Sequence, residues 1–124
     1  MKILCVDRMP WSLKLMLDTL SEVAPGAVIR SCREPRDAIA IAREEGCDVL
    51  MTEMEFGRRL TEGVDLARAI KKINPQVNII FVTGCSERDC PKDLIQLRIS
   101  GFISKPYEPT SFEEEFANLR YAVS

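Results

Sequence analysis

The sequence predicts an α/β fold: three layers built on a five-stranded parallel sheet. Short, continuous apolar runs alternate along the chain with longer segments whose apolar residues recur at helical spacing. Apolar runs of this kind are typical of parallel strands that helices bury on both faces. The expected strands are residues 2–6, 27–31, 48–52, 77–82 and 101–104. With 124 residues, the chain is long enough for one self-sufficient core, so we treat residues 1–124 as a single domain.

Prolines mark the starts and ends of the expected helices. Pro10 and Pro35 suit the first turn of a helix, and Asn74-Pro75 ends one. Pro91 confines the fourth helix to a short segment. The helices are expected at residues 10–23, 35–46, 62–73, 91–97 and from about 109 to the end. This strict alternation predicts a (βα)5 unit with right-handed crossovers.

Composition excludes several classes of protein. A net charge of -2 gives no general attraction to nucleic acid, and no apolar stretch approaches the ~20 residues that cross a bilayer. The chain enters a strand at once, without a signal-like leader, so we expect a cytoplasmic protein that binds neither membrane nor nucleic acid directly. The absence of histidine excludes hydrolases with a Ser-His-Asp triad and zinc sites built on histidine.

The cysteines are odd in number and form no C-x-x-C pair. Lying in or beside strands, they are typical of small buried residues in a reducing compartment, although zinc binding stays an alternative. They are Cys5, Cys32, Cys47, Cys85 and Cys90.

Four chemically active residues come at or just past the ends of predicted strands: Asp7, Glu53, Thr83 and Lys105. In a parallel sheet the carboxyl ends of the strands converge on one crevice, where sites are built. We therefore expect these four side chains to meet. A partly buried Lys105 needs a partner, and Glu53 is the expected one.

Taken in order, four fragments resemble the receiver domain of two-component response regulators, most closely receivers of the LytR/AlgR type. The fragments are Val6-Asp7, the stretch 48–55, the stretch 79–83 and the stretch 101–106. The resemblance implies a flavodoxin-like fold with strand order 2-1-3-4-5. It also implies a site where two adjacent acids and an aspartate bind Mg²⁺, and where that aspartate takes a phosphoryl group from a histidine kinase. A Thr and a Lys then bind the phosphoryl oxygens, and the Lys-Pro peptide bond is usually cis.

The chain keeps only part of that apparatus. Asp7 matches the first acid, but Arg8 stands at the second and Glu53 stands at the phosphoacceptor position. Thr83 matches the switch hydroxyl, and Lys105 matches the lysine that binds the phosphoryl oxygens. A further match, Phe102, falls at the switch aromatic, whereas Gly57 replaces the usual proline in a loop that looks about two residues longer.

These substitutions change the charge of the site. Asp7, Arg8, Glu53 and Lys105 sum to about zero, so we expect no cofactor, and Mg²⁺ binding at Asp7 and Glu53 that is weak if it occurs. Glu53 either mimics the activated form by pairing with Lys105 or Thr83, or forms a structural ion pair with Arg8. The hypothesis is a pseudo-receiver, not an enzyme, that acts by binding proteins and does not use the phosphorylation cycle.

Other interpretations of the function remain open. The chain could be an active phosphoacceptor receiver that uses Mg²⁺, or the N-terminal regulatory domain of a DNA-binding transcription regulator. A small enzyme of flavodoxin-like fold is disfavoured because no glycine-rich phosphate loop is present. Expected partners are a histidine kinase or an output protein. The resemblance also suggests a homodimer through the fourth helix, fifth strand and fifth helix, although Pro91 shortens that fourth helix.

Overall fold

The computed structural model describes residues 1–57, 61–85 and 94–123, and within these the predicted alternation of strands and helices is confirmed. The strands are β1 (Lys2–Val6), β2 (Val28–Cys32), β3 (Val49–Thr52), β4 (Asn78–Thr83) and β5 (Gly101–Ser104). The helices are α1 (Pro10–Val23), α2 (Pro35–Glu45), α3 (Glu62–Ile73), α4 (Leu94–Leu97) and α5 (Pro109–Val123).

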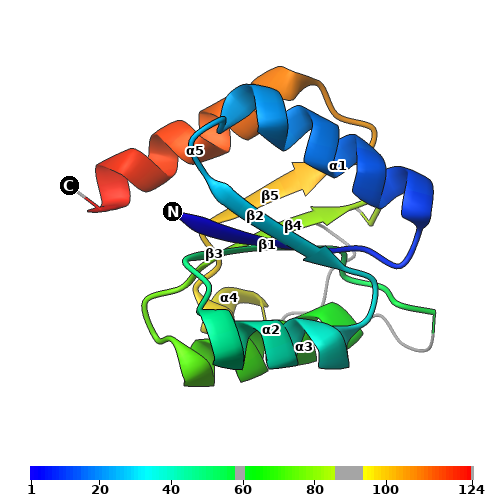
Figure 1. The fold of residues 1–124 in the computed structure, drawn as a ribbon, viewed down its shortest axis with the longest axis vertical. Helices are drawn as coiled ribbons and strands as arrows, with labels where there is room; N and C mark the ends of the chain where they lie inside the picture. The colour runs from blue at the N-terminus through cyan, green and yellow to red at the C-terminus, as the bar shows by residue number, and fades with distance from the viewer. Residues whose placement is uncertain (58–60, 86–93, 124) are drawn as a thin grey trace.

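The strands form one parallel sheet in the order β2-β1-β3-β4-β5, as the resemblance implied. Helices α1 and α5 cover one face, and α2, α3 and α4 cover the other, which gives three layers (Figure 1). All strands therefore point their carboxyl ends toward the same edge of the sheet. This edge is where the candidate site is built.

Some element bounds differ from the prediction by a residue or two. β2 lies one residue later than predicted at both ends, because each of its five residues pairs with a residue of β1, from Lys2–Val28 to Val6–Cys32. β4 extends to Thr83, which is the last residue of the strand and not the first residue past it. The predicted start of the fourth helix, residues 91–93, lies outside the described residues.

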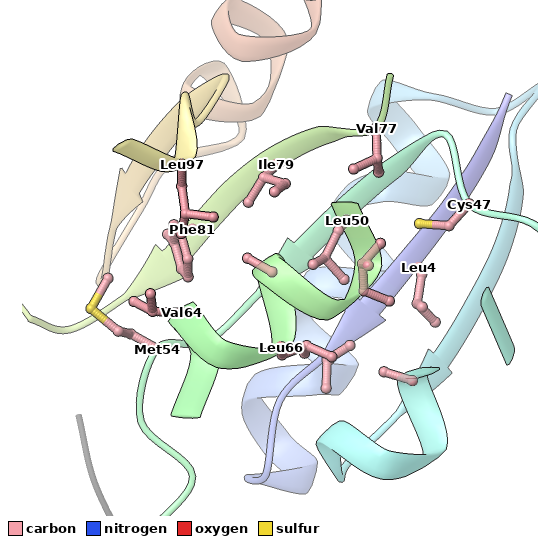
Figure 2. Close-up of a cluster of buried hydrophobic side chains, with 14 of the residues drawn as sticks. Leu4, Cys47, Leu50, Met54, Val64, Leu66, Val77, Ile79, Phe81 and Leu97 are labelled. Carbon is pink, nitrogen blue, oxygen red and sulfur yellow. The ribbon is translucent and has the colours of Figure 1, made fainter. Parts of the chain in front are cut away.

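The strands bury both faces, as their continuous apolar runs predicted. Alternate residues of β3 point to opposite sides: Leu50 joins the cluster under α2 and α3, and Met51 joins the cluster under α1 and α5. Figure 2 shows the first of these clusters, to which Leu66 of α3 and strand residues such as Leu4 and Ile79 belong. Burying side chains of this size stabilises the fold by roughly 1.5–3 kcal/mol each.

Cys5 and Cys47 are buried among apolar residues, and Cys32 is partly buried against the same core. They pack as small apolar side chains, whereas Cys90 lies outside the described residues. Within the described part of the chain, no helix is both long enough and apolar enough to cross a bilayer.

Candidate functional site

Lys105 joins two carboxylates at the carboxyl edge of the sheet. Its ammonium lies 2.7 Å from Asp7 Oδ2 and 2.8 Å from Glu53 Oε2. The three side chains are 19%, 1% and 12% exposed, respectively, so the ion pairs lie largely out of water. Each residue directly follows a strand (β5, β1 and β3), and the parallel topology therefore brings them together from distant parts of the chain.

Asp7 is held by the start of α1 as well as by Lys105. Its Oδ1 accepts a hydrogen bond from the Met9 N–H at 3.0 Å, and its Oδ2 accepts one from the Ser12 hydroxyl at 2.6 Å. The carboxylate is therefore fully engaged although it is buried, which offsets the cost of removing it from water.

Glu53 folds its carboxylate back onto its own loop. Oε1 accepts hydrogen bonds from the N–H groups of Met54 at 2.7 Å and Glu55 at 3.4 Å, while Oε2 faces Lys105. The methylene that distinguishes glutamate from aspartate gives the side chain the reach for both contacts. Both oxygens thus have donors from the chain itself.

The two carboxylates determine how firmly Lys105 keeps its proton. Burial alone would lower the pKa of the Lys105 ammonium, but the hydrogen bonds and negative charges of Asp7 and Glu53 outweigh it and raise that pKa above its usual value. Lys105 is therefore cationic throughout the physiological range. Its backbone is fixed too, since its N–H donates to the Thr83 carbonyl at 2.9 Å and its peptide bond to Pro106 is cis.

Thr83 lines the same hollow, and among the described residues no hydrogen bond joins its hydroxyl to Asp7, Glu53 or Lys105. Its side chain is buried, and its hydroxyl accepts a hydrogen bond from the Cys85 N–H at 3.2 Å. Phe102 lies on β5 opposite Phe81 of β4 and packs, partly buried, against the apolar cluster. Its role as a switch stays a prediction.

Arg8 lines the hollow but pairs with neither of the two carboxylates. Among the residues that the structure describes, the Arg8 guanidinium makes no ion pair with Asp7, Glu53 or any other carboxylate. It lies instead over Gly57, whose φ of 98° is open to glycine, and a Cβ added there would be 3.0 Å from Arg8 Cζ. The expected pairing of Arg8 within the site is thus not observed, because Lys105 already occupies both facing oxygens.

The hollow over the site has a volume of about 530 Å³ and is open to solvent. Trp11, the second residue of α1, lies on its rim with 66% of its surface exposed. Met9 and Leu15 are also exposed large apolar residues, so an apolar strip at the start of α1 borders the polar site.

The residues present do not fit Mg²⁺ in the way the resemblance implies. This cation prefers six oxygen ligands in octahedral geometry. The site offers two carboxylates, Asp7 and Glu53, whose oxygens already accept hydrogen bonds from the chain. Arg8 stands at the position of the second of the two adjacent acids. Across the described residues, no group of three acidic or cysteine side chains is arranged to hold a metal ion.

Two supporting residues of the site were not predicted from the sequence. The Ser12 hydroxyl donates to Asp7, and only the position of a small hydroxyl residue in the first turn of α1 could have indicated this. Gly63 lets α3 approach the end of β3: its N–H donates to the Met54 carbonyl at 2.8 Å, and an added Cβ would lie 2.6 Å from Met54 Cα. A glycine in a helix at a strand end is the signal that could have found it.

Comparison with known proteins agrees with this geometry. A family model described as the response regulator receiver domain matches residues 3–117. No curated protein matches the chain. Among solved structures, a response regulator receiver domain protein from Clostridium thermocellum is 23% identical, with a TM-score of 0.82 over 98% of this chain and 97% of that one.

Two other similar structures extend the comparison. The chemotaxis protein CheY4 of Vibrio cholerae is 18% identical, with a TM-score of 0.80 over 94% of this chain and 95% of that one. A CheY-like receiver domain from Methylobacillus flagellatus is 17% identical, with a TM-score of 0.80 over 95% of this chain and 97% of that one. At these identities the structural matches show the fold alone, and the family model carries the family.

Proposed function

Because this chain belongs to the response regulator receiver domain family, we propose that it is a degenerate receiver that signals by binding other proteins. Receiver domains are modules of two-component signalling, normally without catalytic output of their own, and they interact with histidine kinases and output domains. The finer part of the proposal is that this chain does not use the phosphorylation cycle.

The observation that carries the proposal is the double pairing of Lys105 with Asp7 and Glu53. A phosphoacceptor needs a carboxylate oxygen free to attack phosphorus and a lysine free to receive the phosphoryl oxygens. Here Glu53 stands at the acceptor position with one oxygen on backbone N–H groups and the other on Lys105. Both partners of the reaction are thus already bound to each other.

The same contact supports one of the two roles considered for Glu53. Its carboxylate gives Lys105 the negative partner that a phosphoryl group would otherwise supply, although with a charge of only about -1 compared with about -1.5 to -2. The alternative role, a structural pair with Arg8, has no such contact in its favour. We therefore propose that Glu53 acts as a permanent substitute for the modified aspartate.

Incubation with acetyl phosphate and Mg²⁺, followed by intact-protein mass spectrometry and Phos-tag gels, tests the proposal. The wild-type chain is expected to gain no phosphoryl mass. The matched control is the double variant Arg8→Asp/Glu53→Asp, which rebuilds the acids of the usual site and is expected to become phosphorylated. Stoichiometric, acid-labile phosphate on the wild-type chain would support the active-receiver alternative and refute ours.

Protein binding is supported by the apolar strip of Met9, Trp11 and Leu15 beside the site. Exposed apolar side chains that gather at a functional edge are typical of interaction surfaces.

We also propose, from the resemblance, that the chain can form a homodimer through α4, β5 and α5. Sedimentation equilibrium over a range of concentrations tests that second point, and a monomer at every concentration would refute it.

A further inference from the structure

We infer that two copies of this chain associate through the carboxyl edge of the sheet, with a cationic patch of each copy covering an acidic groove of the other. The cationic patch is the apolar strip together with two arginines, Arg8 and Arg33. The acidic groove is lined by Glu34, Ile39, Phe56, Glu62, Asp65 and Leu66. The inference goes beyond the proposed function and does not depend on it, because a chain could dimerise in this way whether or not it is phosphorylated.

The cationic patch combines exposed apolar side chains with arginines that lack an acidic partner. Trp11 and Leu15 are neighbours on the surface of α1, since they are four residues apart, and both are largely exposed. Arg33 Nε donates to the Arg8 carbonyl at 2.9 Å, which brings a second guanidinium to the start of α1. Among the residues that the structure describes, neither Arg8 nor Arg33 pairs with a carboxylate. An exposed indole beside positive charge is typical of a protein interface.

The acidic groove lies between the starts of α2 and α3, on the face of the sheet opposite α1 (Figure 1). It has a volume of about 500 Å³ and is open to solvent. Ile39, Phe56 and Leu66 give it an apolar floor that is continuous with the core on that face. A hollow of this kind can take an apolar side chain of a second protein molecule.

The charge of the groove is opposite to that of the patch. Of the described charged residues that line it, three are acidic and one, Arg36, is basic. Glu62 accepts a hydrogen bond from the Phe56 N–H at 3.1 Å, and Asp65 pairs with Arg68 at 3.5 Å. Glu34 is exposed, and no hydrogen bond or ion pair joins its carboxylate to another described residue. The groove therefore fits a surface that is both apolar and cationic, which this chain itself carries.

Patch and groove adjoin at two loops, so a two-fold axis can place each on the other. Arg33 of the patch is followed directly by Glu34 of the groove, and Arg8 lies against Gly57, the neighbour of Phe56. When two surfaces lie side by side, rotation by 180° about an axis between them brings each one opposite the other on the second copy. The contact is then made twice, and the assembly closes as a dimer. Arg33 faces Glu34 of the second copy in this arrangement.

Sedimentation velocity on the whole chain, from about 5 µM to about 1 mM, tests the inference. Wild type is expected to show a reversible equilibrium between monomer and dimer, with a Kd on the order of 100 µM, as suits a small interface. Trp11 is the only tryptophan, and its emission should shift to the blue as the dimer forms. Trp11→Ala is expected to weaken the dimer about tenfold or more, because buried tryptophans contribute most to such contacts.

Charge reversal identifies the two surfaces. Arg33→Glu and Glu34→Arg are each expected to weaken the homodimer about tenfold or more, because each sets like charges against each other twice. An equal mixture of these two variants should form a heterodimer, because both contacts are then between opposite charges. The matched control is Lys72→Glu, which makes the same charge change at an exposed residue in the last turn of α3 and should dimerise like wild type. Circular dichroism confirms that every variant is folded.

A wild-type chain that stays monomeric at every concentration would overturn the inference. So would a dimer that is unchanged in Trp11→Ala and in both charge reversals. That second result is expected if the copies associate through α4, β5 and α5, because these elements contain none of the residues of the patch or the groove. Labelling of wild type by acetyl phosphate would refute the proposed function and leave this dimer untouched, so the two can fail separately.

Discussion

The two ends of the sheet use similar polar contacts at different depths, and the difference shows which of them are functional. At the amino end, the Lys2 backbone N–H donates to Asp48 at 2.8 Å, and Arg30 pairs with Glu45 at 3.0 Å, with side chains that are 53% and 38% exposed. At the carboxyl end, Lys105 pairs with two carboxylates that are almost or largely buried. Distances are similar, but the surroundings are not.

Depth changes what each contact contributes. An exposed ion pair is screened by water and contributes between nothing and about 1 kcal/mol. Removing one partner of a buried pair costs several kcal/mol, because the remaining charge loses its partner and stays shielded from solvent. Stability alone does not explain why Asp7 and Lys105 are buried, because a buried ion pair is weak evidence for stability. Their burial at the carboxyl edge therefore indicates a function. Four changes test this contrast, in order of expected effect.

The largest effect is expected from Asp7→Ala. It leaves the Lys105 ammonium with one carboxylate and removes the acceptor of Ser12 and of the Met9 N–H. We expect a loss of about 3 kcal/mol in the free energy of unfolding, measured by urea denaturation followed by circular dichroism. Asp7→Asn, which keeps an acceptor of the same shape, should lose less. A loss below about 1 kcal/mol for Asp7→Ala would mean that the site is no more costly to disturb than the surface.

The next effect depends on close approach of backbones. Gly63→Ala would put a Cβ 2.5 Å from the Glu53 carbonyl oxygen, so α3 or the Glu53 loop must shift. We expect a net loss of about 2 kcal/mol, since overpacking outweighs the better helix propensity of alanine. At the amino end, Gly26→Ala meets no atom within 4 Å and should change stability by less than about 0.5 kcal/mol. Equal losses in the two variants would contradict the contrast between the ends.

The contrast also explains how much the sequence could predict. Periodicity identified the strands because each is apolar on both faces, and it gave α3 its observed bounds of Glu62–Ile73. The bounds of β2 were less well predicted, by one residue at each end, because only one of its edges is paired and Arg30 and Ser31 interrupt its apolar run, so pairing with β1 decides the register. The strand order came from the resemblance, since apolar pattern alone does not order parallel strands.

For the site, the sequence predicted that Asp7, Glu53 and Lys105 lie close together, because each follows the carboxyl end of a strand in one parallel sheet. It did not give the orientation of Arg8. A long side chain next to a strand end can turn inward or outward, and the choice depends on Lys105 filling the interior and Gly57 leaving room outside. Both residues are distant in sequence, so no local pattern carries this information.

Alkaline pH separates the site from the rest of the core. Burial raises the pKa of Cys47, near the amino end, to about 12 and that of Cys32 to about 11, whereas unfolded thiols ionise near 8.5. Above about pH 9 the folded chain therefore keeps protons that the unfolded chain loses, and stability falls by about 1.4 kcal/mol per pH unit for each such thiol. The raised pKa of Lys105 keeps its ion pairs until the pH exceeds 10.5.

Urea denaturation at pH 7, 9 and 10 measures this fall. Cys47→Ala should show a smaller loss between pH 9 and 10 than wild type, because one of the ionising thiols is gone. A variant that loses stability as steeply as wild type would mean that another group controls the alkaline side.

The smallest effect is expected at the amino end itself. Arg30→Ala removes the exposed pair with Glu45 and should lower the free energy of unfolding by less than about 0.5 kcal/mol. Raising the salt concentration should reduce even that loss, because exposed charges are screened over about 8 Å at physiological ionic strength. Asp7→Ala should keep most of its effect in the same salt series, since its partners are buried. If the two variants respond to salt alike, the ion pairs at the carboxyl end are as exposed to water as the pair at the amino end. That result would contradict the difference in depth between the two ends.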